Sequence, residues 1–357
     1  MFDMPDFSHH EEIALFSDPH SGLRIIVAIH NTSRGPAIGG CRMWPYASAA
    51  AAAADALRLS KGMTYKAAIA QLPCGGGKSV VIGDPARDKT GHLLQALGLA
   101  VDSLRGRYTI SDDVGINARD LAVLRGVTPY VAGPVTELGE FSPATAYGVF
   151  QGILATAAHA LERDDLSGVT VAVQGLGAVG YRLCGYLAER HAELTVSDLR
   201  SELTARAAKE FGARVLTPEE ILFAKVDILA PCALGSVLND HTIPRLRCKA
   251  VAGAANNQLR EPRHGELLHS RGITYAPDYV VNVGGLIDLV HEQRGNYAVA
   301  AVLRDCERIY RTTREVLARA RSEDRPPNEI ADRIAEERFS AARTRFDVTA
   351  GKPSLSA

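Results

Sequence analysis

The stretch PCGGGKSVVIGD, residues 73–84, places a lysine directly after three glycines and before an apolar run. Glycine lets a ligand approach the backbone closely, and lysine becomes a general base when burial or a nearby cation favours its neutral form. A second lysine, Lys66, lies twelve residues before Lys78. One ammonium group could hold a small anion while the other acts as a base, although a solvated surface charge is the more ordinary fate of a lysine.

The same stretch also suggests a phosphate-binding loop, which requires the pattern GxxxxGK[ST]. Counting back from Gly77, Lys78 and Ser79, the first glycine of that pattern falls at residue 72, which is Leu72. The preceding residues, 63–73, have a helical pattern, whereas a phosphate-binding loop follows a strand. We therefore interpret Lys78 as a site residue that is not part of a nucleotide triphosphate loop.

A nucleotide site is predicted about 100 residues later, at Gly175-Leu-Gly177-Ala-Val-Gly180. This GxGxxG pattern follows the strand-like VTVAVQ and opens a predicted helix, as dinucleotide-binding loops do. Asp198 ends the next predicted strand, 23 residues after Gly175. An acidic residue there binds the adenosine ribose hydroxyls and repels a 2′-phosphate. The pattern predicts NAD as cofactor, with Arg200 as a feature that weakens the preference over NADP.

The elements that must position these residues follow two patterns. In the first part of the chain we expect a strand at 24–30, a helix at 47–70 interrupted at Gly62, a strand at 79–83 and a helix at 90–104. From Ala144 onward, predicted helices (144–163, 178–190, 201–211, 217–223 and 262–270) alternate with apolar strands, the last of them within ITYAPDYVV. After Asn282, glycines and then helices continue to about residue 347. Alternating strands and helices indicate parallel βαβ units.

The predicted fold class is therefore α/β with two domains separated by a cleft. Residues 1–140 are expected to form an α/β domain for substrate binding and oligomerisation. Residues 141–330 are expected to form a doubly wound Rossmann domain that binds NAD, and a C-terminal helix at about 330–357 to pack back on the first domain.

Composition excludes several other classes of function. The 357 residues carry a net charge of −1 and are 46% hydrophobic, which provides sizeable cores but no electrostatic footprint for nucleic acid or a membrane surface. The six cysteines show no zinc-like spacing, so we expect no metal and free thiols in a reducing cytoplasm. The N-terminus lacks a secretory signal, and no apolar run is long enough to span a membrane.

Several segments, taken in order, resemble the amino-acid dehydrogenases of the Glu/Leu/Phe/Val family, and its leucine-specific branch most of all. They are GPAIGGCRMWPY (35–46), LRLSKGMTYKAAIAQLPCGGGKSVVIGDP (57–85), SDDVG (111–115), PATAYGV (143–149), QGLGAVG (174–180), PCALG (231–235), AGAANNQL (252–259) and APDYVVNVGG (276–285). The resemblance implies reversible, NAD-dependent oxidative deamination of a branched-chain L-amino acid to a 2-oxo acid and ammonium by a homo-oligomer.

The resemblance also implies roles for particular residues. Lys66 would bind the substrate carboxylate, Lys78 would be the catalytic lysine that activates water, and Asp113 would move protons to and from the substrate nitrogen. Gly39, Gly40 and Met63 would line the carboxylate end of the pocket, and the glycines at 75–77 would clear space so that Lys78 reaches the substrate. Asn257 would reach the substrate, and Asn282, Gly284 and Gly285 would form a loop facing the cleft. The implied cofactor contacts are Gly175, Gly177, Ala178, Val179, Gly180, Asp198, Leu199, Thr145, Cys232, Ala233, Ala254, Asn256 and Asn282.

Three features bear on the substrate side chain. Ile38, Val283 and Leu286 are apolar and suit a branched aliphatic side chain, whereas Ser111 stands where the leucine-specific branch usually has alanine. Asp112 stands where that branch usually has glutamate, and the segment 134–142 lacks the expected glycine-rich loop. Alternatives within the family are therefore phenylalanine, valine or tryptophan dehydrogenases. More distant alternatives are a 2-hydroxy-acid dehydrogenase and a catalytically inactive NAD-binding protein.

Overall fold

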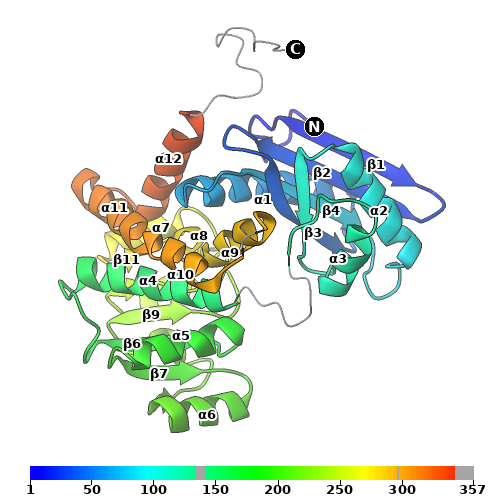
Figure 1. Ribbon diagram of the computed structural model, residues 1–357. Helices are drawn as coiled ribbons and strands as arrows, with labels where there is room; N and C mark the ends of the chain where they lie inside the picture. The colour runs from blue at the N-terminus through cyan, green and yellow to red at the C-terminus, as the bar shows by residue number, and fades with distance from the viewer. Residues whose placement is uncertain (134–141, 296, 342–357) are drawn as a thin grey trace. The chain divides into compact units, whose positions relative to one another are not determined.

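The computed structural model describes residues 1–133, 142–295 and 297–341 (Figure 1). By internal packing the chain divides into two compact units, Met1–Glu140 with Ala335–Ala357, and Phe141–Ile334. None of the helices in the described part of the chain is long and apolar enough to cross a lipid bilayer.

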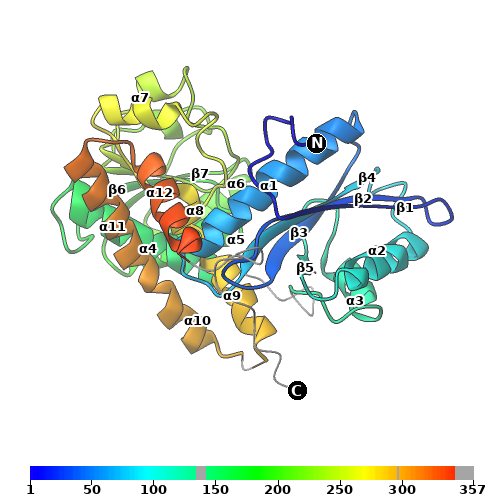
Figure 2. The same ribbon diagram turned by 90° about the horizontal axis from the view of Figure 1, so that it is seen from above.

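The first unit is built on a mixed sheet with the strand order β1-β2-β4-β3-β5 (Figure 2). Its strands are β1 (Glu12–Asp18), β2 (Leu23–Asn31), β3 (Ala37–Trp44), β4 (Gly75–Ile82) and β5 (Tyr108–Ser111). β2 pairs antiparallel with β1 and β4, while β3 pairs parallel with β4 and β5. β1 and β3 were not predicted from the sequence, and β3 carries Gly39 and Gly40.

Both faces of this sheet are covered by helices, as the alternation along β2 requires. Ile26 and Ala28 pack with α1 (Ala49–Ile69), whereas Ile25, Val27 and Ile29 point to the other face. That face is covered by α2 (Gly91–Ser103) and α3 (Ala118–Arg125). The expected interruption at Gly62 is wrong, because α1 runs through it. A helical glycine costs only about 1 kcal/mol, which the packing of α1 offsets.

The three glycines before Lys78 belong to β4 and were wrongly expected to clear space for a ligand. A Cβ atom on Gly76 would come 2.1 Å from the backbone nitrogen of Thr64 in α1, and one on Gly77 would come 2.7 Å from the Tyr108 ring. Helix α1 and Tyr108 therefore contact the bare backbone of β4. The glycines are required by packing on both faces of the strand that carries Lys78.

The second unit is built on a parallel sheet with the order β11-β10-β9-β6-β7-β8. Its strands are β6 (Thr170–Gln174), β7 (Glu193–Ser197), β8 (Arg214–Val215), β9 (Ile228–Pro231), β10 (Ala250–Val251) and β11 (Thr274–Tyr275). This is the doubly wound order of dinucleotide-binding folds, in which the direction of winding reverses between β6 and β9. The predicted fold class, α/β with a Rossmann sheet, is confirmed.

The helices of the second unit largely match the predicted ones. They are α4 (Ser142–Ala160), α5 (Ala178–Ala188), α6 (Ser201–Phe211), α7 (His264–Ser270), α8 (Asp278–Val281), α9 (Gly284–Gln293), α10 (Val299–Cys306) and α11 (Arg308–Glu323). The helix predicted at 217–223 is wrong, because only a 3₁₀ turn, Ile221–Phe223, forms before Ala224 adopts an extended ψ of 138°. The strand predicted through ITYAPDYVV ends at Tyr275, and DYVV is the helix α8, which starts after Pro277.

Helix α12 (Pro327–Ser340) has a proline at its first position. Its last turns contact the end of α1: Tyr65 Oη donates to Glu336 Oε1 at 2.5 Å, and Arg338 donates to the carbonyl of Ile69. These contacts lie within the first unit, which includes the residues from Ala335 onward. The rest of the predicted 330–357 segment, beyond residue 341, lies outside the described residues.

Candidate active site

Lys78 and Asp113 form an ion pair in the first unit, close to the carboxyl end of β5. Lys78, in β4, is only 6% exposed, and its Nζ donates a hydrogen bond to Oδ2 of Asp113 in the loop after β5. The other carboxylate oxygen of Asp113, Oδ1, accepts from the backbone N–H of Val114 at 2.7 Å. The two residues that the resemblance pairs in proton transfer are therefore in direct contact.

Asp113 is ionised in this arrangement. Burial raises its pKa, but the charge and hydrogen bond of Lys78, together with the charge of Arg42, outweigh burial and hold the pKa below its usual range. The carboxylate is therefore unprotonated at neutral pH, and its lowered pKa makes it a weaker base than a free aspartate.

Gly40 and Gly39 are required by different neighbours. A Cβ atom on Gly40 would come 2.6 Å from the carbonyl oxygen of Asp112 and about 3 Å from both Asp113 Cβ and Lys78 Nζ. One on Gly39 would come 1.8 Å from the carbonyl oxygen of Gly77. Gly40 thus lies directly beside the ion pair, whereas Gly39 is enclosed within the sheet.

Lys66 and Met63 lie three residues apart on α1 and share one helix face, and both are half-buried. Their binding of a substrate carboxylate stays a prediction. Ser111 and Ile38 are buried in β5 and β3, and Ser111 Oγ donates to Asp112 Oδ1 at 2.9 Å. The departure at 134–142 falls almost wholly outside the described residues.

Arg42 was missed by the sequence reasoning. It follows Gly40 by two residues in β3, so the two point to the same face of the sheet. Its guanidinium bridges two carboxylates, with Nη1 at 2.9 Å from Asp55 Oδ2 and Nη2 at 3.4 Å from Asp113 Oδ2. Strand alternation from Gly40, had β3 been recognised, would have placed Arg42 beside the pair. It also lines a hollow of about 620 Å³ together with Trp44, Tyr46, Asp55 and Val114.

In the second unit the three glycines of the GxGxxG loop have distinct surroundings. Gly175 has a φ of +94°, which a residue with a side chain rarely adopts, and a Cβ on Gly180 would come 2.0 Å from the carbonyl of Gly175. A Cβ on Gly177 would meet no atom within 4 Å. Gly177 is also the N-cap of α5 and makes no side-chain cap, so its open space and the helix N-terminus suit a pyrophosphate.

Asp198 lies beside this loop at the end of β7. Its Oδ2 accepts from the backbone N–H of Leu176 at 2.7 Å, and its Oδ1 accepts from the N–H of Arg200 at 2.9 Å. Burial raises its pKa, but these hydrogen bonds and the charge of Arg200 lower it below the usual range. The loop therefore carries a fixed negative charge where the ribose of a dinucleotide is bound in this fold.

Several other predicted cofactor residues lie at the carboxyl ends of the parallel strands. The N–H of Cys232 donates to the carbonyl of Gln174 at 2.7 Å, and a Cβ on Gly175 would touch Ala233. Asn282 Nδ2 donates to Asn256 Oδ1 at 2.7 Å and to the carbonyl of Ala254 at 3.1 Å. The strands β6, β9 and β10 thus bring Cys232, Ala233, Ala254, Asn256 and Asn282 to one edge of the sheet.

The loop predicted at Asn282, Gly284 and Gly285 is wrong for the two glycines, whereas Asn282 lies in a two-residue turn between helices. Asn282 caps α8, and Gly284 and Gly285 begin α9. A Cβ on Gly284 would come 2.1 Å from the carbonyl of Ala144 and 2.9 Å from Thr145 Cα, so α9 starts directly against α4. Ala178 and Leu199 are exposed and Val179 is half-buried around the glycine loop, and Asn257 is exposed with a φ of +52°. Val283 and Leu286 are buried, and their contact with a substrate stays a prediction.

One group of potential metal ligands occurs among the described residues: Asp240, Glu261 and His264. Arg263 already pairs with both carboxylates, at 2.6 Å from Asp240 and 2.9 Å from Glu261. His264 Nδ1 accepts from the backbone N–H of Glu261, so Nε2 carries the ring proton of the neutral side chain. The group is therefore interpreted as an ion-pair cluster.

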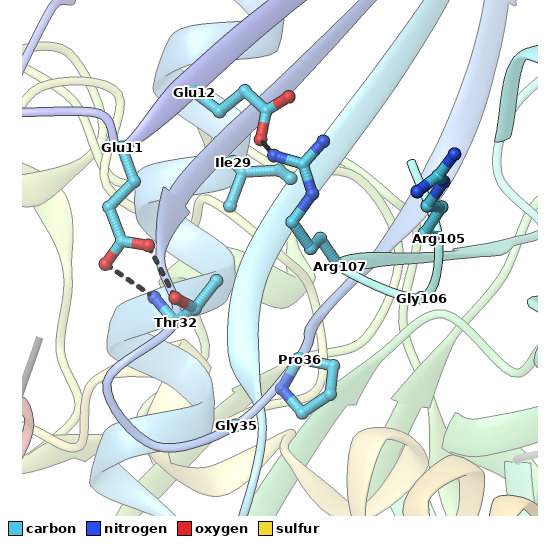
Figure 3. A pocket seen from close by; sticks show the side chains of 9 residues that line it. All are labelled: Glu11, Glu12, Ile29, Thr32, Gly35, Pro36, Arg105, Gly106 and Arg107. Atoms are coloured by element: carbon cyan, nitrogen blue, oxygen red, sulfur yellow. Dashed lines mark hydrogen bonds and ion pairs between the residues drawn. The ribbon is translucent and has the colours of Figure 1, made fainter. Parts of the chain in front are cut away.

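A second hollow of the first unit, of about 370 Å³, lies between β1, β2 and the turn before β5 (Figure 3). Glu12 pairs with Arg107 there, and Glu11 accepts from the N–H and hydroxyl of Thr32. None of the predicted site residues in the described part of the chain lines this hollow, so it is distinct from the Lys78 site.

The comparisons with known proteins agree with this geometry. Residues 10–130 match the profile of the Glu/Leu/Phe/Val dehydrogenase dimerisation domain, and residues 197–305 match the profile of glutamate/leucine/phenylalanine/valine dehydrogenases. The chain is 46% identical to leucine dehydrogenase of Geobacillus stearothermophilus over 96% of this chain and 94% of that protein. It is 43% identical to phenylalanine dehydrogenase of Caldalkalibacillus thermarum, over 93% and 92% of the two chains.

A solved structure, that of L-tryptophan dehydrogenase from Nostoc punctiforme, matches with a TM-score of 0.87 and 43% identity, covering 93% of this chain and 96% of that one. The sequence and structure matches therefore extend along nearly the whole chain, and the two profiles match parts of both units. The chain belongs to the Glu/Leu/Phe/Val dehydrogenase family, and it is an amino-acid dehydrogenase that depends on a pyridine nucleotide.

Proposed function

We propose that the enzyme catalyses the reversible, NAD-dependent oxidative deamination of a branched-chain L-amino acid to the 2-oxo acid and ammonium. The observation that carries the proposal is the ion pair of Lys78 and Asp113 beside the bare backbone of Gly40. A lysine and a carboxylate in direct contact can pass protons to and from an amino-acid nitrogen bound beside them.

The reaction needs a neutral substrate amine and, after oxidation at Cα, a water activated for attack on the iminium carbon. In the proposed mechanism Lys66 binds the substrate carboxylate, Asp113 takes a proton from the substrate nitrogen and returns one, and Lys78 deprotonates the attacking water. Gly40, which has no side chain, lets Lys78 and Asp113 come into contact. NAD, when bound, accepts the hydride from Cα. Exclusion of water strengthens these charge interactions.

Residues 1–140 with the C-terminal helix are assigned substrate binding and oligomerisation, and residues 141–330 are assigned NAD binding. NAD is favoured over NADP because the Asp198 carboxylate, fixed by Leu176 and Arg200, would face a 2′-phosphate with like charge. Asn256, Asn282 and Thr145 are assigned to the nicotinamide side.

Homo-oligomerisation through the first unit is supported by the profile match to a dimerisation domain over residues 10–130. In the described sheet, β1 has a neighbouring strand on one side only. All six cysteines lie in the described residues and are free thiols, which supports a reducing cytoplasm.

A branched aliphatic substrate is supported by the leucine dehydrogenases at 46% identity and by the apolar Ile38, Val283 and Leu286. Ser111 is the residue that favours the alternative, a phenylalanine or tryptophan dehydrogenase. Its hydroxyl, however, is engaged with Asp112. One methylene changes specificity by only about 1–3 kcal/mol, so direct comparison of substrates is needed.

Steady-state rates on a panel of L-amino acids, each with NAD and with NADP, test the proposal. We expect the highest kcat/KM for leucine, valine or isoleucine with NAD. Strong turnover of phenylalanine or tryptophan, with little for the aliphatic substrates, would replace the proposed substrate. Reduction of 2-oxo acids by NADH without ammonium would instead indicate a 2-hydroxy-acid dehydrogenase.

A further inference from the structure

We propose that Arg42 is a positioning residue for Asp113: its guanidinium, anchored on Asp55, keeps the Asp113 carboxylate in place and charged when the charge on Lys78 changes during the reaction. This inference rests on the proposed function, because it assigns Arg42 a part in the same proton transfer.

Four side chains form a continuous series of contacts. Lys78 donates to Asp113 Oδ2, Arg42 Nη2 lies 3.4 Å from that same oxygen, and Arg42 Nη1 donates to Asp55 Oδ2 at 2.9 Å. Asp113 Oδ1 is bound to the N–H of Val114. The Asp113 carboxylate is thus held from three directions, and Lys78 is only one of them.

Arg42 is itself held firmly. Asp55, in α1, also accepts from Tyr46 Oη at 2.6 Å and from Arg58 at 2.6 Å, and its side chain is only 14% exposed. The Nε of Arg42 is buried without a hydrogen-bond partner among the described residues. The side chain is held by its two carboxylates, through Nη1 and Nη2.

Two cations of different kinds are needed by the proposed reaction. When Lys78 gives up its proton to act as a base, its attraction for Asp113 disappears. A buried carboxylate that loses its only cation takes up a proton or moves toward water. Arginine stays charged throughout the accessible pH range, so Arg42 supplies a permanent charge while Lys78 supplies a variable one.

Other titratable and charged groups surround the pair from each neighbouring element. They are Cys41 and Arg42 of β3, Tyr108 of β5, Asp120 of α3 with its partner Lys89, Asp112 next to Asp113, and Asp55, Arg58 and Lys66 of α1. Asp120 is neutralised by Lys89 at 2.7 Å. Burial keeps the Cys41 thiol neutral by raising its pKa to about 12. Among the described residues, Arg42 is the cation of permanent charge that pairs with Asp113.

The test compares pH profiles of kcat/KM for oxidative deamination in the wild-type enzyme, Arg42→Gln, Arg42→Lys and Arg58→Gln. Removing a fixed cation makes protons bind more tightly to the groups beside it. The acidic limb of Arg42→Gln is therefore expected to move up by about one pH unit, whichever of those groups controls it. Arg58→Gln is the charge-matched control, since Arg58 is half-exposed and, among the described residues, pairs with Asp55 and not with Asp113.

Arg42→Lys keeps the charge but lacks the fork that bridges two carboxylates. We expect its acidic limb to stay near the wild-type position while kcat falls about fivefold or more. A merely structural role would lower activity evenly across pH in Arg42→Gln and leave the limb unmoved, which overturns the inference.

Thermal melting shows whether each variant folds. If Arg42→Gln does not fold, Arg42→Lys and Asp55→Asn decide, and wild-type kcat in both overturns the inference. If the wild-type enzyme forms no NADH with any amino acid, the proposed function fails and the inference fails with it. Wild-type activity with an unshifted Arg42→Gln profile removes the inference alone.

Discussion

Lys78 Nζ and Asp113 Oδ2 are joined by a hydrogen bond, although their residues lie on different elements and 35 positions apart. The lysine enters from β4 and the aspartate from the loop after β5, and β3 lies between these two strands in the sheet. On that intervening strand, Gly40 lies beside the pair and has no side chain to separate the two residues. The contact therefore depends on the strand order as much as on the two charged residues.

Replacing Lys78 tests whether this contact performs the chemistry. In Lys78→Ala we expect kcat to fall by roughly 10²–10⁴-fold, because the base is removed while NAD binding, in the other unit, is retained. Asp113→Asn keeps the shape of the side chain and should cause a loss of similar size. Stopped-flow and steady-state rates measure the loss, and fluorescence titration with NADH measures cofactor binding.

Lys249→Ala is the matched control, since Lys249 pairs with Asp227 at 2.9 Å in the second unit. It should leave kcat unchanged. Undiminished turnover in Lys78→Ala would contradict the mechanism and favour an NAD-binding protein without this catalytic role.

Asp198 gives a prediction for cofactor choice. In Asp198→Asn the negative charge is removed, while the amide oxygen can still accept from the N–H of Leu176. The ratio of kcat/KM with NAD to kcat/KM with NADP should fall about tenfold or more, since like-charge repulsion of a 2′-phosphate is lost and Arg200 is freed to attract it. An unchanged ratio would place the discrimination elsewhere.

Substitutions at Gly177 and at Gly180 should affect different properties, cofactor binding at Gly177 and stability at Gly180. Gly180→Ala would force a Cβ to 2.0 Å from the carbonyl of Gly175, so we expect a loss of about 1–3 kcal/mol in stability, seen as a lower Tm. Gly177→Ala meets no protein atom, so Tm should hold while KM for NAD rises severalfold. If Gly177→Ala binds NAD normally, the pyrophosphate does not approach this backbone.

Much of the second unit was predictable because its signals are local. The loop GLGAVG and Asp198 carry the geometry of the dinucleotide site in their own spacing, and α6 begins and ends where its pattern predicts. DYVV was misjudged as part of a strand because a short apolar run does not distinguish a strand from one helical turn. The helix predicted at 217–223 was too long, because only the 3₁₀ turn Ile221–Phe223 forms there. The sheet order alone decides that Cys232 and Ala233 lie beside Gly175.

The first unit was less predictable because its site depends on contacts distant in sequence. The two glycines of β3 are poor strand formers, so the sequence did not predict this strand. The position of Arg42, which lies on β3, was missed for the same reason. The glycines at 75–77 looked like a loop for a ligand because nothing in the local sequence indicates that α1 and Tyr108 press against them. Lys78 was singled out by the glycines before it and Asp113 only by the resemblance, and their contact became visible only when β5 was placed.

Two buried histidines below the same sheet predict how stability depends on pH. His10 and His30 contact one another edge to face, with ring centroids 4.8 Å apart, and His30 Nδ1 lies 2.9 Å from the hydroxyl of Thr64, which packs on Gly76. Burial and, after it, the charges of His10 and Lys61 lower the pKa of His30 to about 3. Both rings are therefore neutral in the folded protein at neutral pH, since burial also lowers the pKa of His10.

A histidine whose pKa is lowered by folding stabilises the protein fully above its unfolded pKa, near 6.5, and that stability is lost as the pH falls toward 3. The loss is at most about 1.4 kcal/mol per pH unit for each such ring. In His30→Gln, which can still hydrogen-bond Thr64, we expect a lower free energy of unfolding at pH 7.5 but a shallower decline between pH 6.5 and 4.5. Over that range the free energy of unfolding of the wild type should fall by about 2 kcal/mol more than that of His30→Gln.

Urea unfolding followed by circular dichroism at fixed protein concentration measures both quantities, because oligomer dissociation would otherwise change the apparent stability. His20→Gln is the control, since His20 is exposed and should leave the slope at its wild-type value. Parallel slopes in His30→Gln and wild type would mean that His30 is not neutral in the folded protein. A shallower slope instead ties the acid sensitivity of the enzyme to the layer that supports the strand carrying Lys78.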